Sequence, residues 1–419
     1  MMRTLRFAIA ALCIAPPLAA QATKPVCAPD NAGLMLQPGF CALVVAESLG
    51  PARHIVVLEN GDLLVAVAGP HGGVRLLRDT TGDGKADVIR AFGPQGGTGI
   101  AFAGEYLYFA TNDAVVRWHW NIGQLEPPPP TGGDTIVSGL TVGRANAAKG
   151  IAIGADGQLY VNIGAPSNSC QARDRAPESP GADPCSQLDI AAGIWRFDPR
   201  RGNQTQSDGQ RFATGLRNAL AMAVDPATGS LFAAQHGRDQ LASNWPKLYS
   251  AALSAELPAE EVFRLEAGGD YGWPYCYYDQ RRRQQVLQPE YGGDGKMVGR
   301  CESIPQPAVA FPGHWAPDGL TFYNSRRFPL RYRGGMFVAF HGSWNRPEPQ
   351  AGYKVMFVPF AGGVATGPAE VFADGFAGPV VTPNGAKYRP TGVAVGPDGS
   401  LYVASDQGAG AVLRILSQP

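Results

Sequence analysis

Six copies of one short pattern are spread along the chain, and they constrain its fold more than any other feature. Each copy has an apolar segment, a polar turn and a second apolar segment, and the first segments start at positions 53, 98, 150, 221, 319 and 392. A further apolar segment follows in each copy, at 74–78, 115–120, 194–197, 262–265, 354–360 and 412–415. AsnGly and AspGly pairs in the turns are typical of hairpins. The pattern therefore predicts repeated antiparallel strands.

A multi-strand unit in six copies predicts an all-β fold, a six-bladed β-propeller with disulfide-stapled loop insertions. A β-sandwich or barrel is the alternative. The apolar segment at 40–46 lies outside the six copies, and we expect it to complete the last blade and close the ring. Segments 168–192 and 268–312 are irregular and are predicted as insertions. Residues 23–419 then form a single propeller domain.

The first 22 residues have the features of a secretory signal peptide. Arg3 and Arg6 precede an apolar stretch at 7–14, and small residues at 20–22 suit cleavage. That stretch is too short to span a bilayer, and no other run of 18 apolar residues occurs. We therefore expect an exported protein, periplasmic or secreted, with no membrane span.

The charge balance argues against one class of partner. The chain has 35 basic and 35 acidic residues, a formal net charge of zero, and no long run of like charges. Proteins that bind nucleic acid usually carry a basic patch or an excess of positive charge. We therefore expect no nucleic-acid partner.

Six cysteines remain after the predicted signal peptide, namely Cys27, Cys41, Cys170, Cys185, Cys276 and Cys301. An even number in an exported protein indicates disulfides, although six cysteines allow 15 pairings. They fall into three pairs of sequence neighbours, so we predict the bonds 27–41, 170–185 and 276–301. The chain has no CxxC or CxxCH motif, which makes zinc binding the weaker interpretation and leaves covalent haem without its attachment motif.

The repeat also predicts where functional residues gather. Antiparallel pairing puts the start of each first strand and the end of each second strand on one face, so six such rims surround one axis. Four of the six starts carry a cation, from Arg53, Lys149, Arg217, and Lys387 with Arg389. The same rim carries Asn218, Gln235, His236, Asp239, His314, Asp318, His341 and Asp406. Converging cations suit a ligand with several carboxylates or phosphates. The alternative is that each arginine only pairs with a neighbouring carboxylate or carbonyl.

An acidic loop is a second candidate site. Asp79, Asp83 and Asp87 have spacings similar to the first part of a calcium loop. However, Thr81 replaces an expected acidic residue, and Arg90 stands where a bidentate glutamate would close the site. A calcium site and a plain acidic turn between blades are both open interpretations.

Several segments together resemble the soluble glucose/sorbosone dehydrogenase family, and its sorbosone-dehydrogenase-like branch more than the glucose-dehydrogenase branch. The segments are ThrGlyLeuArgAsnAlaLeu at 214–220, AlaAlaGlnHisGlyArgAspGln at 233–240, TyrGlyTrpProTyrCys at 271–276, ArgGlyGlyMetPheValAlaPheHisGlySerTrpAsnArg at 333–346 and LysTyrArgProThrGlyValAlaVal at 387–395. The resemblance covers nearly the whole chain after residue 22. It implies a six-bladed propeller that uses pyrroloquinoline quinone and calcium.

The resemblance also implies roles for individual residues. Those expected to hold the quinone are Arg217, Asn218, Gln235, Lys387, Arg389 and Asp406. The Gly237 carbonyl and Asp239 fall where the family holds its calcium.

One position departs from the family. The family uses a histidine at the start of the third repeat as general base, and Asn146 occupies that place here. An amide cannot accept the proton that oxidation of an alcohol or aldehyde hydrate releases. The candidates for a replacement base are His236, His341 and Lys149, with His314 as a further histidine on the rim.

Two functions from different classes follow. The first is a quinoprotein oxidoreductase, a dehydrogenase that oxidises a sugar, polyol or related aldehyde with pyrroloquinoline quinone and calcium. It would pass electrons to a separate acceptor, a cytochrome or quinone. The second is a non-catalytic propeller that binds a carbohydrate, an anionic ligand or an exported protein partner. A calcium-dependent propeller hydrolase is a third, minor option.

Overall fold

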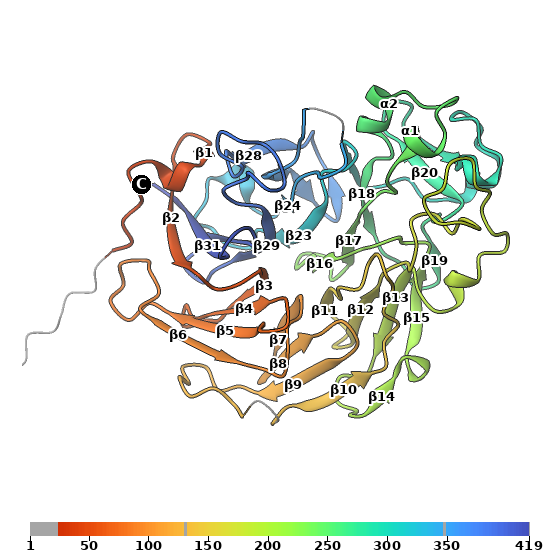
Figure 1. The fold of residues 1–419 in the computed structure, drawn as a ribbon. Coiled ribbons are helices and arrows are strands. Elements are labelled where there is room, and N and C mark those ends of the chain that lie inside the picture. The colour runs from red at the N-terminus through yellow and green to blue at the C-terminus, as the bar shows by residue number, and fades with distance from the viewer. Residues whose placement is uncertain (1–23, 130–131, 347–348, 419) are drawn as a thin grey trace, which may run out of the picture.

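Six β-sheets surround one central axis in the computed structural model, which describes residues 24–129, 132–346 and 349–418 (Figure 1). The predicted signal peptide, residues 1–22, lies outside the described residues. Within the described ranges, no helix is long and apolar enough to cross a membrane. The predicted six-bladed β-propeller is confirmed.

Each blade is an antiparallel sheet of four main strands, which follow chain order in all but the last blade. The first three blades contain β3 (Ala52–Val57), β4 (Leu63–Val67), β5 (Gly73–Arg78) and β6 (Val88–Phe92); β7 (Gly99–Ala103), β8 (Tyr106–Ala110), β9 (Val115–His119) and β10 (Asp134–Ser138); and β11 (Ile151–Ile153), β12 (Leu159–Ile163), β13 (Gly193–Phe197) and β15 (Gln210–Thr214).

The last three blades contain β16 (Ala221–Val224), β17 (Leu231–Gln235), β18 (Glu260–Arg264) and β22 (Val309–Phe311); β23 (Pro317–Phe322), β24 (Met336–Phe340), β25 (Lys354–Val358) and β28 (Glu370–Asp374); and β29 (Pro390–Val395), β30 (Leu401–Ser405), β31 (Ala411–Ser417) and β2 (Phe40–Glu47). Short outer strands β1 (Met35–Leu36), β14 (Gln204–Thr205) and β19 (Gly269–Asp270) join the fifth, second and third sheets.

Ring closure depends on β2, which the chain supplies before the first blade. It pairs antiparallel with β31 from Phe40 opposite Ser417 to Glu47 opposite Ala411. The expectation that the segment at 40–46 completes the last blade is therefore confirmed. The first strands of the blades contact one another around the axis in the order β3, β7, β11, β16, β23, β29 and back to β3. Closure removes the exposed edge that an open sheet would leave.

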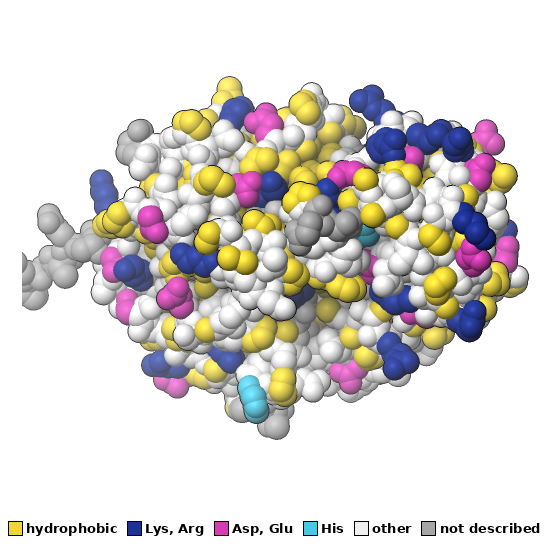
Figure 2. All heavy atoms as spheres, turned by 45° about the horizontal axis from the view of Figure 1, so that its top comes forward, with side chains coloured by type: hydrophobic (Ala, Val, Ile, Leu, Met, Phe, Trp, Pro, Cys, Tyr) yellow, Lys and Arg dark blue, Asp and Glu magenta, His cyan; other side chains and the backbone are white. Residues whose placement is uncertain are grey.

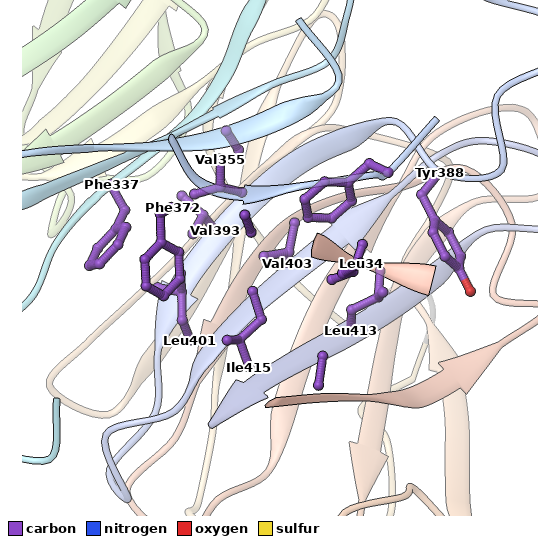
Figure 3. Packing of buried hydrophobic residues seen from close by; sticks show 14 of the residues in the cluster. Leu34, Phe337, Val355, Phe372, Tyr388, Val393, Leu401, Val403, Leu413 and Ile415 are labelled. Carbon is purple, nitrogen blue, oxygen red and sulfur yellow. The ribbon is translucent and has the colours of Figure 1, made fainter. Parts of the chain in front are cut away.

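The hydrophobic core is divided among the interfaces between blades. Each of the six interfaces holds its own cluster of buried side chains. Figure 3 shows the cluster between the fifth and sixth blades, to which the fifth blade contributes Phe337 and Phe372 and the sixth blade Val403 and Leu413. The second strand of a blade packs on both faces, and all five residues of β4 are buried. This explains why such strands read as continuous apolar runs in the sequence.

Three insertions, at 164–192, 236–259 and 265–308, cover one side of the ring near the fourth blade, and the sequence did not predict the second of them (Figure 1). They carry α1 (Leu241–Asn244), α2 (Ala251–Glu256) and the hairpin of β20 (Cys276–Asp279) and β21 (Gln284–Leu287); a second small hairpin joins β26 (Phe360–Ala361) and β27 (Val364–Ala365). The disulfides are Cys27–Cys41, Cys170–Cys185 and Cys276–Cys301, as the sequence order predicts. The last two close loops within the insertions predicted at 168–192 and 268–312.

We expect Leu413→Ala to lower the free energy of unfolding by about 2–5 kcal/mol, because it opens a cavity in a fully buried blade interface. Urea denaturation followed by fluorescence measures the change. The control is Val371→Ala on the outer strand β28, whose side chain is exposed, and which should change the stability by less than about 0.5 kcal/mol. Equal effects of the two substitutions would contradict the assignment of the core to the blade interfaces.

Candidate functional site

A cavity of about 400 Å³ lies at the rim where the first strands of the blades begin. The rim residues that line it are Arg53, Arg217, Asn218, His236, Gly237, Asp239, His314, Asp318, His341 and Arg389. A histidine side chain is visible near the centre of the face drawn in Figure 2, where acidic and basic groups are interspersed. Every blade except the second contributes residues to this cavity, and the insertions contribute further residues. Arg53, Arg217 and Arg389 all have carboxylate or backbone-carbonyl partners within the protein, as the alternative interpretation of the sequence expected.

Arg53 joins two carboxylates from different blades. Its Nη2 donates to Asp318 Oδ2 at 2.8 Å, and its Nη1 donates to Asp406 Oδ2 at 2.6 Å. Each carboxylate also contacts a histidine, with His236 Nε2 3.1 Å from Asp318 Oδ1 and His341 Nε2 2.7 Å from Asp406 Oδ1. A carboxylate on one ring nitrogen fixes the orientation of an imidazole and stabilises its protonated form. Both histidines are therefore held in place beside the cavity.

The charges in this network set its protonation. Burial opposes ionisation of Asp318, but Arg53 and the neighbouring histidines hold its pKa well below the usual range. Burial likewise opposes ionisation of Asp406, and His341 and Arg53 lower its pKa. Burial also disfavours the charged form of His236, but Asp318 raises its pKa above the ordinary value. Both aspartates are thus ionised at neutral pH.

Irregular pairing aims two of these side chains into the cavity. The register of β3 against β4 shifts between Ala52 and Ile55, and that of β23 against β24 shifts between Pro317 and Gly319. Arg53 and Asp318 lie within these two irregular segments. Such bulges turn side chains away from the regular alternation and are frequent beside functional sites.

A second cluster surrounds Asp239. Its Oδ2 accepts from Arg175 Nη2 at 2.9 Å and from Arg217 Nη2 at 3.0 Å. Its Oδ1 accepts from Asn345 Nδ2 at 2.6 Å, and His314 Nδ1 lies 3.7 Å from the same oxygen. Burial opposes ionisation of this carboxyl, but Arg217, His314 and Arg175 hold its pKa well below the usual range. Asp239 is therefore ionised and fully engaged by nitrogen donors.

These contacts test whether calcium fits the residues that the sequence assigns to it. The Gly237 carbonyl accepts from Arg217 Nη1 at 2.9 Å, and the Asp239 carboxylate accepts from two guanidinium groups. A calcium ion needs six to eight oxygen ligands at about 2.3–2.6 Å. A guanidinium cannot lose its proton to vacate an oxygen. The donor set around Asp239 therefore does not fit calcium as these side chains lie.

Two adjacent buried glutamates lie at the start of β18. Glu260 lines the cavity and accepts from the backbone N–H groups of Gly237, at 2.8 Å, and Ala316, at 3.2 Å. Burial raises the pKa of Glu260 above the usual value. Burial also raises the pKa of Glu261 to about 8, and Gln285 Nε2 donates to its Oε2 at 3.2 Å. Glu261 is therefore protonated at neutral pH.

Asn146 and Lys149 lie in the segment that precedes β11. Asn146 lines the cavity, and its Nδ2 donates to the Ala165 carbonyl at 2.8 Å. Lys149 is fully buried, and its Nζ donates to the Ala147 carbonyl at 2.6 Å. Burial lowers the pKa of Lys149 to about 8, although Asp113 opposes the change. The Lys149 side chain is absent from the cavity lining. The hydrogen bond from Lys149 to the Ala147 carbonyl instead supports the backbone of the segment that precedes β11.

The remaining predicted cofactor residues fall into two groups. Arg389 lines the cavity and donates to the carbonyls of His341 and Gly342, at 3.1 and 2.7 Å. Asn218 also lines it, whereas Gln235 lies behind it and accepts from the Arg217 backbone N–H at 3.0 Å. Lys387 does not line the cavity, because its Nζ donates to the Ala32 carbonyl at 3.0 Å.

The acidic loop, expected as a turn between blades, is a hydrogen-bonded turn that joins β5 to β6 within the first blade and contacts β2 of the last blade. Asp79 accepts from the backbone N–H groups of Gly82, at 2.6 Å, and Gly84, at 2.7 Å. Asp83 accepts from the Lys85 N–H, and Asp87 from Thr80. Across the described part of the chain, no group of three or more His, Cys, Asp or Glu side chains is arranged to hold a metal ion. The contacts favour the plain turn.

A sequence profile of the family described as TrAA12-like matches residues 34–417. The chain belongs to the TrAA12-like family. This identification agrees with the resemblance to soluble quinone-dependent sugar dehydrogenases found in the sequence.

Individual relatives of this TrAA12-like protein are distant. The pyrroloquinoline quinone-dependent pyranose dehydrogenase of Coprinopsis cinerea is 27% identical over 247 residues, which are 50% of this chain and 32% of that protein. The aldose sugar dehydrogenase YliI of Escherichia coli is 25% identical over 201 residues, 48% of this chain and 42% of that protein. The chain thus spans about a third of the length of the first curated relatives that it matches.

One solved structure shows the fold of the family. The calcium structure of Trichoderma reesei Carbohydrate-Active Enzymes family AA12 superposes with a TM-score of 0.74 at 19% identity, over 95% of this chain and 99% of that chain. At this identity the likeness shows the propeller fold alone.

Two residues of the site in this TrAA12-like protein, Arg175 and Glu260, were not singled out by the sequence, whereas Trp344 and Asn345 lie in the segment at 333–346 that carries the family resemblance. Arg175 comes from the first insertion, Trp344 and Asn345 follow β24, and Glu260 begins β18. The sequence offered one signal, the polar and aromatic segment at 342–346. The repeat could not place Arg175, because the path of an insertion is independent of the strand pattern.

The buried carboxyl of Glu261 predicts a pH-dependent stability. In the folded protein its pKa is about 8, whereas in the unfolded chain it is about 4.3. The folded state therefore retains a proton that the unfolded state has lost, and the stability of the wild type falls as the pH rises from about 5 to 8. We expect Glu261→Gln to gain roughly 4 kcal/mol relative to the wild type over this range, measured by urea denaturation. Exposed Glu266→Gln is the control and should run parallel to the wild type; parallel curves for Glu261→Gln as well would contradict the assignment.

Proposed function

We propose that this protein is an exported dehydrogenase that uses pyrroloquinoline quinone to oxidise a pyranose or other aldose sugar. The observation that carries the proposal is the convergence of four arginines and three histidines on one central cavity. The names of two relatives, a quinone-dependent pyranose dehydrogenase and an aldose sugar dehydrogenase, support the sugar substrate. The branch resemblance implies sorbosone as the sugar, and dye reduction with sorbosone tests this more specific proposal.

The cavity residues suit the quinone, which has three carboxylates and two adjacent ring carbonyls. Arg53, Arg175, Arg217 and Arg389 line the cavity and provide charged forked donors. The volume of about 400 Å³ lies in the range of small-molecule sites. When bound, the quinone would supply the two-electron acceptor for oxidation of the sugar.

His341 is the proposed base that takes the proton from the sugar hydroxyl. Its Nε2 lies 2.7 Å from Asp406 Oδ1, so the neutral ring carries its proton there and Nδ1 is the accepting nitrogen. Asp406 then stabilises the protonated ring, and Arg53 holds Asp406 in place. His341 also lies three residues before Trp344, which we assign to sugar binding.

Trp344 is proposed to bind the sugar ring at the mouth of the cavity. Its side chain is 59% exposed, and it is the only exposed Trp, Tyr or Phe in the parts of the chain that the structure describes. The loop that carries it is anchored, because Arg346 pairs with Glu256 and donates to the Gly313 carbonyl. An indole held in this way offers an apolar face to the C–H face of a pyranose.

Export and a separate electron acceptor complete the proposal. Three disulfides are typical of proteins that fold in an oxidising compartment, and the first 22 residues have the pattern of a signal peptide. We therefore propose a periplasmic or secreted location. The chain carries no CxxCH motif, so a cytochrome or a quinone would accept the electrons as a separate partner.

A second candidate function is a non-catalytic propeller that binds the quinone or a carbohydrate. Asn146 favours it, since this residue lines the cavity at the place of the family's general base and its amide is bonded to the Ala165 carbonyl. Titration of the purified protein with the quinone, followed by dye reduction with a panel of aldoses, polyols and sorbosone, separates the two. Binding with sugar-dependent reduction supports the dehydrogenase. Binding without turnover supports the second candidate, and no binding contradicts both quinone-based functions.

We expect His341→Gln to lower kcat by about 10²–10⁴-fold, because it removes the proton acceptor. The affinity for the quinone should change little by comparison, and fluorescence titration measures it. His119→Gln is the control, because this histidine is half-exposed on β9 and lies outside the cavity. A folded His341→Gln variant with the kcat of the wild type would show that another group takes the proton.

We expect Trp344→Ala to raise KM for the sugar by about tenfold while kcat stays close to that of the wild type, because the indole binds the ground state and transition state equally. Trp344→Phe retains an aromatic face and should recover most of the loss. Steady-state kinetics with the best sugar of the panel provide the measurement. An unchanged KM for the alanine variant would contradict the role of Trp344.

A further inference from the structure

The surroundings of Asp239 place guanidinium groups where the family resemblance places calcium. Arg217 donates through Nη1 to the Gly237 carbonyl and through Nη2 to Asp239 Oδ2. Arg175 donates through Nη2 to the same Asp239 oxygen at 2.9 Å. The Gly237 carbonyl and the Asp239 carboxylate, which were expected to ligate calcium, therefore already accept hydrogen bonds from guanidinium groups.

Arg175 is held by its own loop. Its backbone N–H donates to Gln171 Oε1 at 2.8 Å, and its Nη1 donates to Gln240 Oε1 at 2.9 Å. The Cys170–Cys185 disulfide closes the loop around it. The guanidinium thus has a defined position at the cavity wall before any ligand arrives, which reduces the entropy lost on binding.

The charges of this cluster favour an anionic ligand without a metal ion. Asp239 accepts from both guanidinium groups, Asp174 Oδ2 lies 3.9 Å from Arg175 Nε, and His314 Nδ1 lies 3.7 Å from Asp239 Oδ1. The side chains of Arg217 and Asp239 are only 6% and 13% exposed, so water screens their charges weakly. Arg175, Arg217 and His314 all line the cavity together with Asp239, so their N–H donors are presented to a ligand there.

We propose that Arg175 and Arg217 take the place of the divalent cation and bind the anionic oxygens of pyrroloquinoline quinone directly, so that cofactor binding does not require calcium. This inference rests on the proposed quinone-dependent function. It assigns to Arg175, a residue from an insertion, a role in cofactor binding that the propeller repeat does not predict.

The test is binding of pyrroloquinoline quinone to the full purified protein, measured by isothermal titration calorimetry in EDTA and again in excess Ca²⁺. We expect dissociation constants that agree within about twofold in the two buffers. We expect Arg175→Gln to raise the dissociation constant in EDTA by about tenfold or more, since one charged forked donor is lost. Arg173→Gln is the matched control, because Arg173 is exposed in the same loop and lies outside the cavity lining.

Two results would overturn different parts of the account. Quinone binding that appears only with Ca²⁺ would overturn the replacement of the cation and leave the proposed function standing. No quinone binding in either buffer would overturn the proposed function itself. Arg175→Lys serves as the second variant if Arg175→Gln fails to fold, as judged by its thermal unfolding. Lysine keeps the charge but not the forked geometry, so undiminished affinity in that variant would also count against the assignment.

Discussion

The pairing of β2 with β31 is the constraint on which the site depends. It joins a strand from the beginning of the described chain to the last blade and so completes a ring of six sheets. Arg53 belongs to the first blade, whereas Asp318 and Asp406 belong to the fifth and sixth blades. These three charged groups meet across the axis only when the ring is closed. Ring closure and assembly of the cavity are therefore one event.

The ion pairs of the site define geometry more than they add stability. Removing charged groups from water opposes the attraction between them, so buried pairs add little net free energy of folding. These ion pairs instead orient the side chains that face the ligand, because each carboxylate holds its partners in one position. Asp406 orients His341 and Asp239 orients Arg217 and Arg175. The stability of the ring comes instead from the six apolar interfaces between blades.

The sequence predicts the fold well because the strand pattern is local and repeated. Turns such as the AsnGly before β4 mark the hairpins, and the apolar segment at 40–46, which lies outside the six copies, was expected to complete the last blade and does so. The sequence also predicts that Arg53, Arg217, His236, His341 and Arg389 meet, because register fixes which strand ends share a rim.

The sequence cannot predict contacts that come from segments outside the repeat. Lys387 has the register of a rim residue, but the segment before β1 brings the Ala32 carbonyl to its amine. Arg175 and Asn345 reach Asp239 from an insertion and a long loop whose paths depend on tertiary packing. For the same reason the sequence suggested oxygens for calcium at Gly237 and Asp239 and gave no sign that guanidinium groups would bind them.

A crystal structure of the protein after incubation with pyrroloquinoline quinone tests the central claim most directly. We expect the quinone in the central cavity, with its carboxylates or carbonyl oxygens bonded to Arg217, Arg389 and Arg175, and with His341 beside the open part of the cavity near Trp344. Quinone bound elsewhere on the protein, with these arginines still bonded only to Asp239 and the backbone carbonyls, would contradict it.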